Sequence, residues 1–172
     1  MTQQTAKEGQ DTMEATELQI KAPGAEGDYL VLRWWAQLKE RGELLDVFAE
    51  HAATPSGFLT IFNHPNTVLF YKDDEQGVAE AIWFEPFMGS VALGLWCRPD
   101  HRHRKYWADL TAAFRMVFQH VPMVMFITKQ HHVVQAARDY GFTVVGEMPY
   151  LYRGEPGFIA YMTREEFEKT HG

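Results

Sequence analysis

The chain has 172 residues, 46% of them hydrophobic and 23% charged, which is typical of a globular protein with one real core. Its net charge of −7 argues against nucleic-acid binding through a generally basic surface. Cys97 is the one cysteine, so no disulfide framework exists within the chain, and no apolar run reaches membrane-spanning length. We therefore expect a cytoplasmic protein, or one assembled into a particle from the cytoplasm, with no nucleic-acid or membrane partner.

The first third of the chain combines a polar start with helical patterns. Residues 1–16 carry few large apolar side chains, so we expect a flexible tail followed by one domain over residues 17–172. Apolar spacing and turn residues then predict the following elements. They are a strand at 17–21, helices at 28–41 and 44–51, and either a strand or a buried loop at 57–62.

The remainder of the chain alternates strands and helices. The expected strands are 67–72, 78–85, 90–97, 121–128, 142–152 and 157–162, the expected helices are 106–119 and 130–140, and a helical turn starts at Thr163. The first three of these strands should form an antiparallel meander. The strands at 91–97 and 121–128 should run parallel, because a helix joins them. The fold class is therefore α/β, a mixed α+β sheet with the order β-α-α-β-β-β-α-β-α-β-β.

A basic turn separates the strand at 90–97 from the helix at 106–119. Arg98, Arg102, Arg104 and Lys105 place four of the sixteen basic residues within eight positions. Cations beside the N-terminus of a helix are typical of an anion site, most often for phosphate. The alternative is a solvated turn whose charges only maintain solubility.

Two carboxylates are candidates for the proton transfers of a reaction. Glu80 lies between Val78 and Ile82 on one strand face, and an apolar setting should raise its pKa and suit it to act as a general base. The alternative is a partly wet face on which Glu80 is ordinary. Glu85, at the end of the same strand, is the second candidate.

The histidines and the cysteine predict no further chemistry. His101 with His103, and His131 with His132, lack a third and a fourth ligand of recognisable spacing, so we expect no metal site. No His–Asp arrangement accompanies Cys97, which argues against a nucleophilic cysteine.

The element order resembles that of the GCN5-related N-acetyltransferase (GNAT) superfamily over roughly residues 17–169. Two segments carry the resemblance: Pro99 followed by Arg102 after the central strand, and residues 136–142 with the pair Gly141-Phe142 before a strand. The resemblance implies a GNAT-like acyl-CoA N-acyltransferase fold, with acetyl-CoA or another acyl-CoA as co-substrate. It also implies a small-molecule or peptide amine as acceptor, with Glu80 taking its proton.

The resemblance also implies which residues bind the cofactor. Those of the central strand would pair with the pantetheine arm, those of the basic turn would hold the pyrophosphate, and Gln130 takes the place of the family's usual Asn. The residues that the resemblance implies for cofactor binding are Leu95, Trp96, Cys97, Arg102, His103, Arg104, Lys105, Tyr106, Trp107 and Gln130.

The chain departs from the family at the positions that matter most. Lys105 and Trp107 stand where the family has small residues that let the backbone approach the anion, and Trp107 suits core packing better. Ala137 stands where the family has the tyrosine that protonates the leaving thiolate. Two alternatives therefore stay open. One is a structural or assembly protein with a protein partner, like GNAT-like phage proteins described as head or internal virion proteins, which the chain resembles in size and in its degenerate loop. The other is a binder of a CoA-type ligand without turnover.

Overall fold

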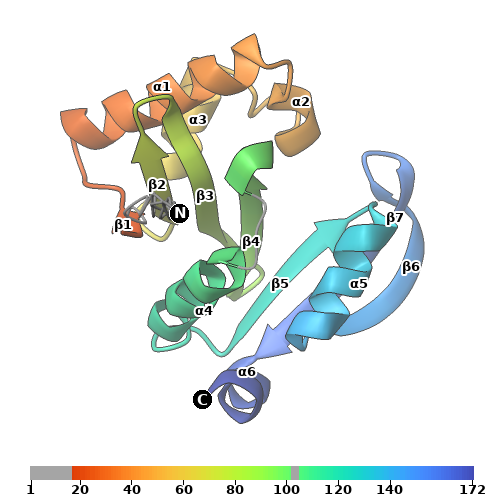
Figure 1. Cartoon of the computed structure of the whole chain (residues 1–172). Coiled ribbons are helices and arrows are strands. Elements are labelled where there is room, and N and C mark those ends of the chain that lie inside the picture. The colour runs from red at the N-terminus through yellow and green to blue at the C-terminus, as the bar shows by residue number, and fades with distance from the viewer. Residues whose placement is uncertain (1–16, 102–104) are drawn as a thin grey trace, which may run out of the picture.

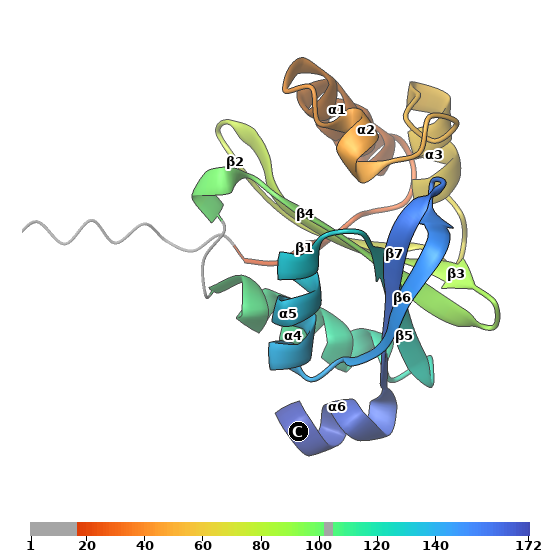
Figure 2. The same ribbon diagram turned by 90° about the vertical axis from the view of Figure 1, so that its right-hand side faces the viewer.

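A seven-stranded mixed sheet with helices on both faces forms the framework of the molecule (Figures 1 and 2). The computed structural model describes residues 17–101 and 105–172, and the side chains of Lys105 and Tyr106 are not described. The tail expected at 1–16 lies outside the described residues. Among these residues, no helix is long and apolar enough to cross a membrane.

The strands are ordered β1-β2-β3-β4-β5-β7-β6 across the sheet. Their bounds are β1 (Gln19–Ile20), β2 (Val68–Asp74), β3 (Gly77–Phe87), β4 (Ser90–Cys97), β5 (Met123–Thr128), β6 (Thr143–Tyr152) and β7 (Glu155–Thr163). The helices are α1 (Ala25–Glu40), α2 (Leu44–Val47), α3 (Pro55–Phe62), α4 (Lys105–Val117), α5 (His131–Tyr140) and α6 (Arg164–His171), with a 3-10 turn at Pro99–His101. Apart from α3 and the length of α6, this is the predicted order.

Strands β4 and β5 are parallel neighbours, and every other neighbouring pair in the sheet is antiparallel. The parallel arrangement predicted for these two strands is confirmed. Helix α4 makes the crossover between them, as a parallel connection requires. The sheet is thus divided at its centre into the meander β1–β4 and the group β5–β7.

Two apolar cores lie on opposite faces of the meander. Trp34 of α1 is the centre of the first core, with Phe58 of α3, Trp83 and Trp96 around it. Phe114 of α4 is the centre of the second, which extends to α5, α6 and β7. In Figure 2, α1, α2 and α3 lie above the meander and α4 lies below it.

The segment predicted as a strand or buried loop at 57–62 is a helix, which corrects the prediction. The Thr54 side chain caps it by accepting a hydrogen bond from the Gly57 N–H, and Pro55 occupies its first turn. Phe58 and Phe62 are four residues apart, so both rings enter the same core. The apolar spacing of this run suits a strand as well as a helix, and the N-cap at Thr54 favours the helix.

Two further predictions differ in extent. The helix expected at 44–51 ends at Val47, because Phe48 adopts extended backbone and turns its ring into the Trp34 core. The strand expected at 121–128 begins at Met123, and only Val124 and Thr128 within it are fully buried. Its remaining side chains are half-buried, since β5 separates from β4 over most of its length.

Candidate functional site

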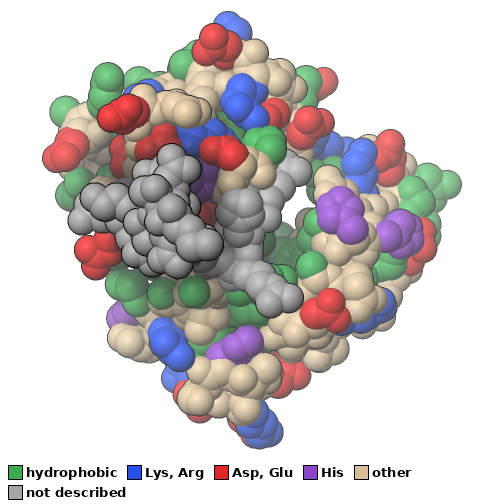
Figure 3. Space-filling view, in the orientation of Figure 1, with side chains coloured by type: hydrophobic (Ala, Val, Ile, Leu, Met, Phe, Trp, Pro, Cys, Tyr) green, Lys and Arg blue, Asp and Glu red, His purple; other side chains and the backbone are tan. Residues whose placement is uncertain are grey.

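The centre of the sheet opens where β4 and β5 separate. The two strands pair only at Val91 with Val124 and at Ala92 with Met125. Beyond Ala92 they diverge (Figure 1), and the space-filling view shows a hollow in the surface between the two parts of the molecule (Figure 3). The edge of β4 from residue 93 to residue 97 thus has no pairing with β5. A strand edge of this kind can pair with an extended ligand through its backbone N–H and C=O groups.

The predicted cofactor residues of β4 differ in what they offer to this opening. Leu95 is 36% exposed and lies on the α4 face of the sheet. Trp96 is buried in the opposite core, and its indole N–H donates a 2.7 Å hydrogen bond to Glu43. Cys97 is half-buried. The side chain of Trp96 therefore does not reach the opening, and this residue can contribute only its backbone to a ligand there.

The basic turn is described only at its two ends. Arg102, His103 and Arg104 lie outside the described residues, and Lys105 and Tyr106 begin α4. Trp107 is half-buried, packs against the second core and stacks on Tyr140 with ring centroids 4.8 Å apart, as its place in the apolar stripe predicts. Gln130 is exposed at the N-cap of α5.

Arg98, counted in the basic cluster of the sequence, is used elsewhere. Its side chain is 3% exposed, and its guanidinium donates to both carboxylate oxygens of Asp74 at the end of β2. These hydrogen bonds hold the pKa of Asp74 below its usual range. His101 lies 3.1 Å from the same guanidinium. Arg98 therefore fastens the start of the turn to the β2–β3 hairpin.

Glu80 is buried beneath α4. A bulge in β3 pairs Lys72 with Glu80 but Asp73 with Val78, so Val78 turns to the opposite core while Ile82 stays on the face of Glu80. The sequence predicted Val78, Glu80 and Ile82 on one face of the strand. In the structure only Ile82 shares the face of Glu80. Glu80 is 3% exposed, and its Oε1 has no hydrogen-bond partner among the described residues.

Burial raises the pKa of Glu80 to about 7, and the nearby carboxylate of Asp109 on α4 adds to the shift. Lys72 opposes it, and its ammonium forms a 2.6 Å ion pair with Asp109. The three groups thus form a charged cluster of β2, β3 and α4. Glu80 is not among the residues that line the pocket at α2 and α3, and its role as the base stays a prediction.

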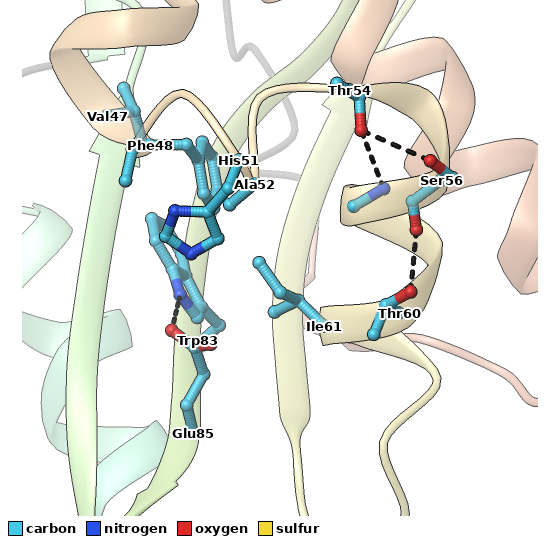
Figure 4. A pocket seen from close by; sticks show the side chains of 12 residues that line it. Val47, Phe48, His51, Ala52, Thr54, Ser56, Thr60, Ile61, Trp83 and Glu85 are labelled. Carbon is cyan, nitrogen blue, oxygen red and sulfur yellow. Dashed lines mark hydrogen bonds between the residues drawn. The ribbon is translucent and has the colours of Figure 1, made fainter.

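Glu85 projects from the other face of β3 into an open pocket of about 620 Å³ (Figure 4). The indole N–H of Trp83 donates a 3.2 Å hydrogen bond to its Oε2. Burial raises the pKa of Glu85, and the indole N–H partly offsets this effect. Glu85 pairs with Ala92, whose β5 partner Met125 is the last before the strands separate. The carboxylate therefore stands one strand away from the start of the opening.

The walls of this pocket come from α2, α3, their connection and β3. They are formed by Val47, Phe48, Ala49, His51, Ala52, Thr54, Ser56, Gly57, Thr60, Ile61, Trp83 and Glu85. The Trp83 ring lies against Gly94 of the neighbouring strand, where a Cβ would be 1.9 Å from the indole, so only glycine fits there. The sequence did not predict this pocket, because the apolar run at 57–62 suits a strand as well as a helix.

Helix α5 supplies no evident proton donor for the leaving thiolate. Ala137 is buried, as its position in α5 requires. Tyr140 donates or accepts a 2.8 Å hydrogen bond with Thr111, and burial raises its pKa to about 12, which does not suit a proton donor near neutral pH. Within residues 17–101 and 105–172, no group of three or more His, Cys, Asp or Glu residues could hold a metal ion.

No protein-family model and no curated protein sequence matches the chain. Solved structures do. The structure resembles a ribosomal-protein-S5-alanine acetyltransferase from Vibrio fischeri with a TM-score of 0.64 and 13% identity, covering 90% of this chain and 97% of that one. It also resembles a spermidine N-acetyltransferase from Vibrio cholerae with a TM-score of 0.63 and 13% identity, covering 88% of this chain and 96% of that one. A third similar structure is an aminoglycoside acetyltransferase in complex with coenzyme A and kanamycin. Its TM-score is 0.64 and its identity 10%, covering 91% of this chain and 100% of that one.

The mixed seven-stranded sheet with its central opening is thus the fold of the GNAT acetyltransferases. At 10–13% identity the similarity shows the fold, and the activity has to be argued from the site.

Proposed function

We propose that the protein is a GNAT-like N-acyltransferase that moves an acyl group from an acyl-CoA to an amine. The observation that carries this proposal is the separation of β4 from β5 beyond Ala92, with the pocket of Glu85 one strand away. The opening suits a donor that lies along a strand edge, and the pocket suits a small acceptor. The solved acetyltransferases with this fold support the same reading.

On this proposal an acyl-CoA would be bound along the edge of β4. The backbone of residues 95–97 would hold the pantetheine arm, and the predicted cations Arg102, Arg104 and Lys105 would meet the pyrophosphate, since charge-assisted hydrogen bonds suit phosphate oxygens. When bound, the thioester supplies an activated acyl group. An unpaired β4 N–H near Leu95 or Cys97 would stabilise negative charge on the carbonyl oxygen.

Glu85 is the base that the geometry favours. Its carboxylate faces a pocket, and Trp83 orients one of its oxygens, which leaves the other for the amine of the acceptor. Glu85 would accept the proton that this amine loses as its nitrogen bonds to the thioester carbonyl carbon. The C–S bond would then break and release CoA as a thiolate, which takes its proton from water. Glu80, by contrast, is 3% exposed and lies beside Asp109 of α4, so its carboxylate offers less surface to an acceptor.

A transfer assay tests the proposal. The chain is incubated with acetyl-CoA and a mixture of small amines and peptides, and acetylated products are identified by mass spectrometry. We expect at least one acetylated amine, and its amount should fall strongly in Glu85→Gln. Complete absence of product in both proteins would contradict transfer.

A second candidate is a GNAT fold that has lost turnover and serves as a structural or assembly protein. Two observations favour it: the half-buried Trp107 stands at a position where the family uses a small residue, and Ala137 replaces the expected proton donor. On this alternative the chain binds neither acetyl-CoA nor CoA. A CoA-type binder without turnover would bind both and transfer nothing.

A further inference from the structure

The first turns of α4 are fastened to both parts of the divided sheet. Towards the β5–β7 group, Trp107 stacks on Tyr140 of α5, and the Thr111 hydroxyl lies 2.8 Å from the Tyr140 hydroxyl. Towards the meander, Lys72 of β2 forms a 2.6 Å ion pair with Asp109, and both side chains are mostly buried. The position of the start of α4 therefore depends on both contacts.

Glu80 belongs to the contact with the meander but takes no part in its ion pair. Its carboxyl group lies beside that of Asp109, and a hydrogen bond between two carboxyl groups requires a proton on one of them. Glu80 is 3% exposed, and its Oε1 has no partner among the described residues. A charge on Glu80 would thus be a second buried negative charge beside a single ammonium.

The elements around Glu80 offer no other free positive charge among the described side chains. Their charged and titratable groups are Lys72 and Asp74 of β2, Cys97 of β4, Arg98, Asp100 and His101 of the turn after β4, and Asp109 of α4. Cys97 is the partner of Glu80 across the ladder, and its thiol carries no positive charge. The charge of Arg98 is taken up by two aspartates. Lys72 and Asp109 are the groups that act on Glu80.

We propose that Glu80 is a positioning residue: in its protonated form it donates a hydrogen bond to Asp109, which together with Lys72 holds the start of α4 against the meander, and loss of the proton loosens this contact. The start of α4 is also the end of the basic turn, so the contact places the backbone N–H groups that would meet the pyrophosphate of an acyl-CoA. This link to an acyl-CoA rests on the proposed function. The fastening rests on the buried carboxyl group and the ion pair beside it.

The proton is lost near neutral pH. Burial raises the pKa of Glu80 to about 7, so the residue passes from mostly protonated at pH 6 to mostly ionised at pH 8. Above pH 7, two carboxylates compete for one ammonium in a site largely closed to water, and their repulsion favours release of α4. The start of α4 should therefore open more readily as the pH rises through this value.

Hydrogen–deuterium exchange of the full chain without ligand tests the fastening at pH 6 and pH 8. After correction for the intrinsic pH dependence of exchange, amides 109–113 should exchange roughly threefold to tenfold faster at pH 8, because opening returns Glu80 to an ordinary pKa. The difference should appear while the amides of α1 are still protected, which shows that the opening is local.

Three variants assign the pH dependence to the carboxyl pair. Glu80→Gln is neutral at both pH values and should remove the difference between them. Asp109→Asn removes the repulsion, leaves Lys72 to an ionised Glu80 and should also remove it. Glu168→Gln makes the first substitution at an exposed position and should retain the difference. Circular dichroism confirms that the variants are folded.

Calorimetric titration with coenzyme A at the same two pH values tests the link to the proposed site. From pH 6 to pH 8 the affinity of the unaltered chain should fall roughly threefold to tenfold more than that of Glu80→Gln. The ligand's own phosphates titrate equally in both experiments, so the comparison cancels their effect. An equal pH dependence of the two affinities would overturn the link.

The outcomes distinguish this inference from the proposed function. If the exchange of α4 depends on pH equally in the unaltered chain and in Glu80→Gln, or if α4 and α1 exchange together, the positioning role is overturned, even if acetyl-CoA binds and is turned over. A local, pH-dependent opening of α4 that Glu80→Gln abolishes would support the role, even if coenzyme A fails to bind, in which case only the link to an acyl-CoA falls.

Discussion

At the scale of single residues, Glu80 and Glu85 lie on the same strand but on opposite faces, and their neighbours give them different chemistry. Glu80 lies between an ion pair and a helix, whereas Glu85 faces a pocket and an indole N–H. The sequence indicated both as candidates and favoured Glu80. Which of the two acts as the base stays a prediction. The sequence could not show that Val78 lies on the opposite face from Glu80, because the bulge that moves it depends on the pairing of β2 with β3.

The burial of Glu80 should make stability depend on pH. Its pKa rises from an ordinary 4.5 to about 7, so the folded chain keeps a proton that the unfolded chain releases. Relative to high pH, this proton stabilises the folded chain by on the order of 3 kcal/mol below pH 4.5, and that stabilisation is lost as the pH rises to about 7. Glu80→Gln should remove this dependence, as measured by urea unfolding at pH 5, 6, 7 and 8.

The exposed Glu168 is the control for that measurement. Glu168→Gln should preserve the difference in stability between pH 5 and pH 8 that the unaltered chain shows. If Glu80→Gln follows the same pH curve as Glu168→Gln, the buried carboxylate does not titrate as described.

For Glu85, the prediction concerns catalysis. Burial raises its pKa, so the ionised base should appear at a higher pH than for an ordinary glutamate, and kcat/KM for transfer should rise with pH through that raised value. Glu85→Gln should lower kcat roughly 10²- to 10⁴-fold and remove this limb of the pH profile. An unchanged profile in Glu85→Gln, or a comparable loss in Glu80→Gln alone, would contradict the assignment.

At the scale of elements, α3 decides whether the pocket exists. Apolar spacing over residues 57–62 did not distinguish a helix from a strand, because short apolar runs suit both. The signal that could have identified it is Thr54-Pro55, an N-cap followed by proline at the first helical position. The start of α6, in contrast, was expected at Thr163, where Thr163 and Glu166 form a capping box.

Removing the cap of α3 should destabilise the protein measurably. Thr54→Ala loses the 3.0 Å bond to the Gly57 N–H, and we expect the free energy of unfolding to fall by about 1 kcal/mol in urea denaturation. Thr60→Ala removes the same side chain from the exposed face of the same helix and should change it by less than about 0.5 kcal/mol. Equal effects of the two substitutions would show that the cap does not matter.

At the scale of the whole molecule, strand order and direction followed from alternation, helical spacing and the need for a crossover helix between parallel strands. No sequence pattern indicates the central opening, since pairing that stops after Ala92 leaves no mark in composition. The same holds for Arg98, whose partner Asp74 is distant in sequence. Local patterns therefore predict elements, whereas contacts across strands and helices determine the site.

The central claim is that the opening between β4 and β5 binds an acyl-CoA, and calorimetric titration with acetyl-CoA tests it most directly. We expect binding that weakens as salt is raised, because the predicted contacts join cations to a pyrophosphate. Replacing Arg102 and Lys105 together with Ala should cost a few kcal/mol of affinity, on the order of 1.5–3 for each charged hydrogen bond. A titration with no heat of binding at millimolar acetyl-CoA, from a chain shown to be folded, would contradict the claim.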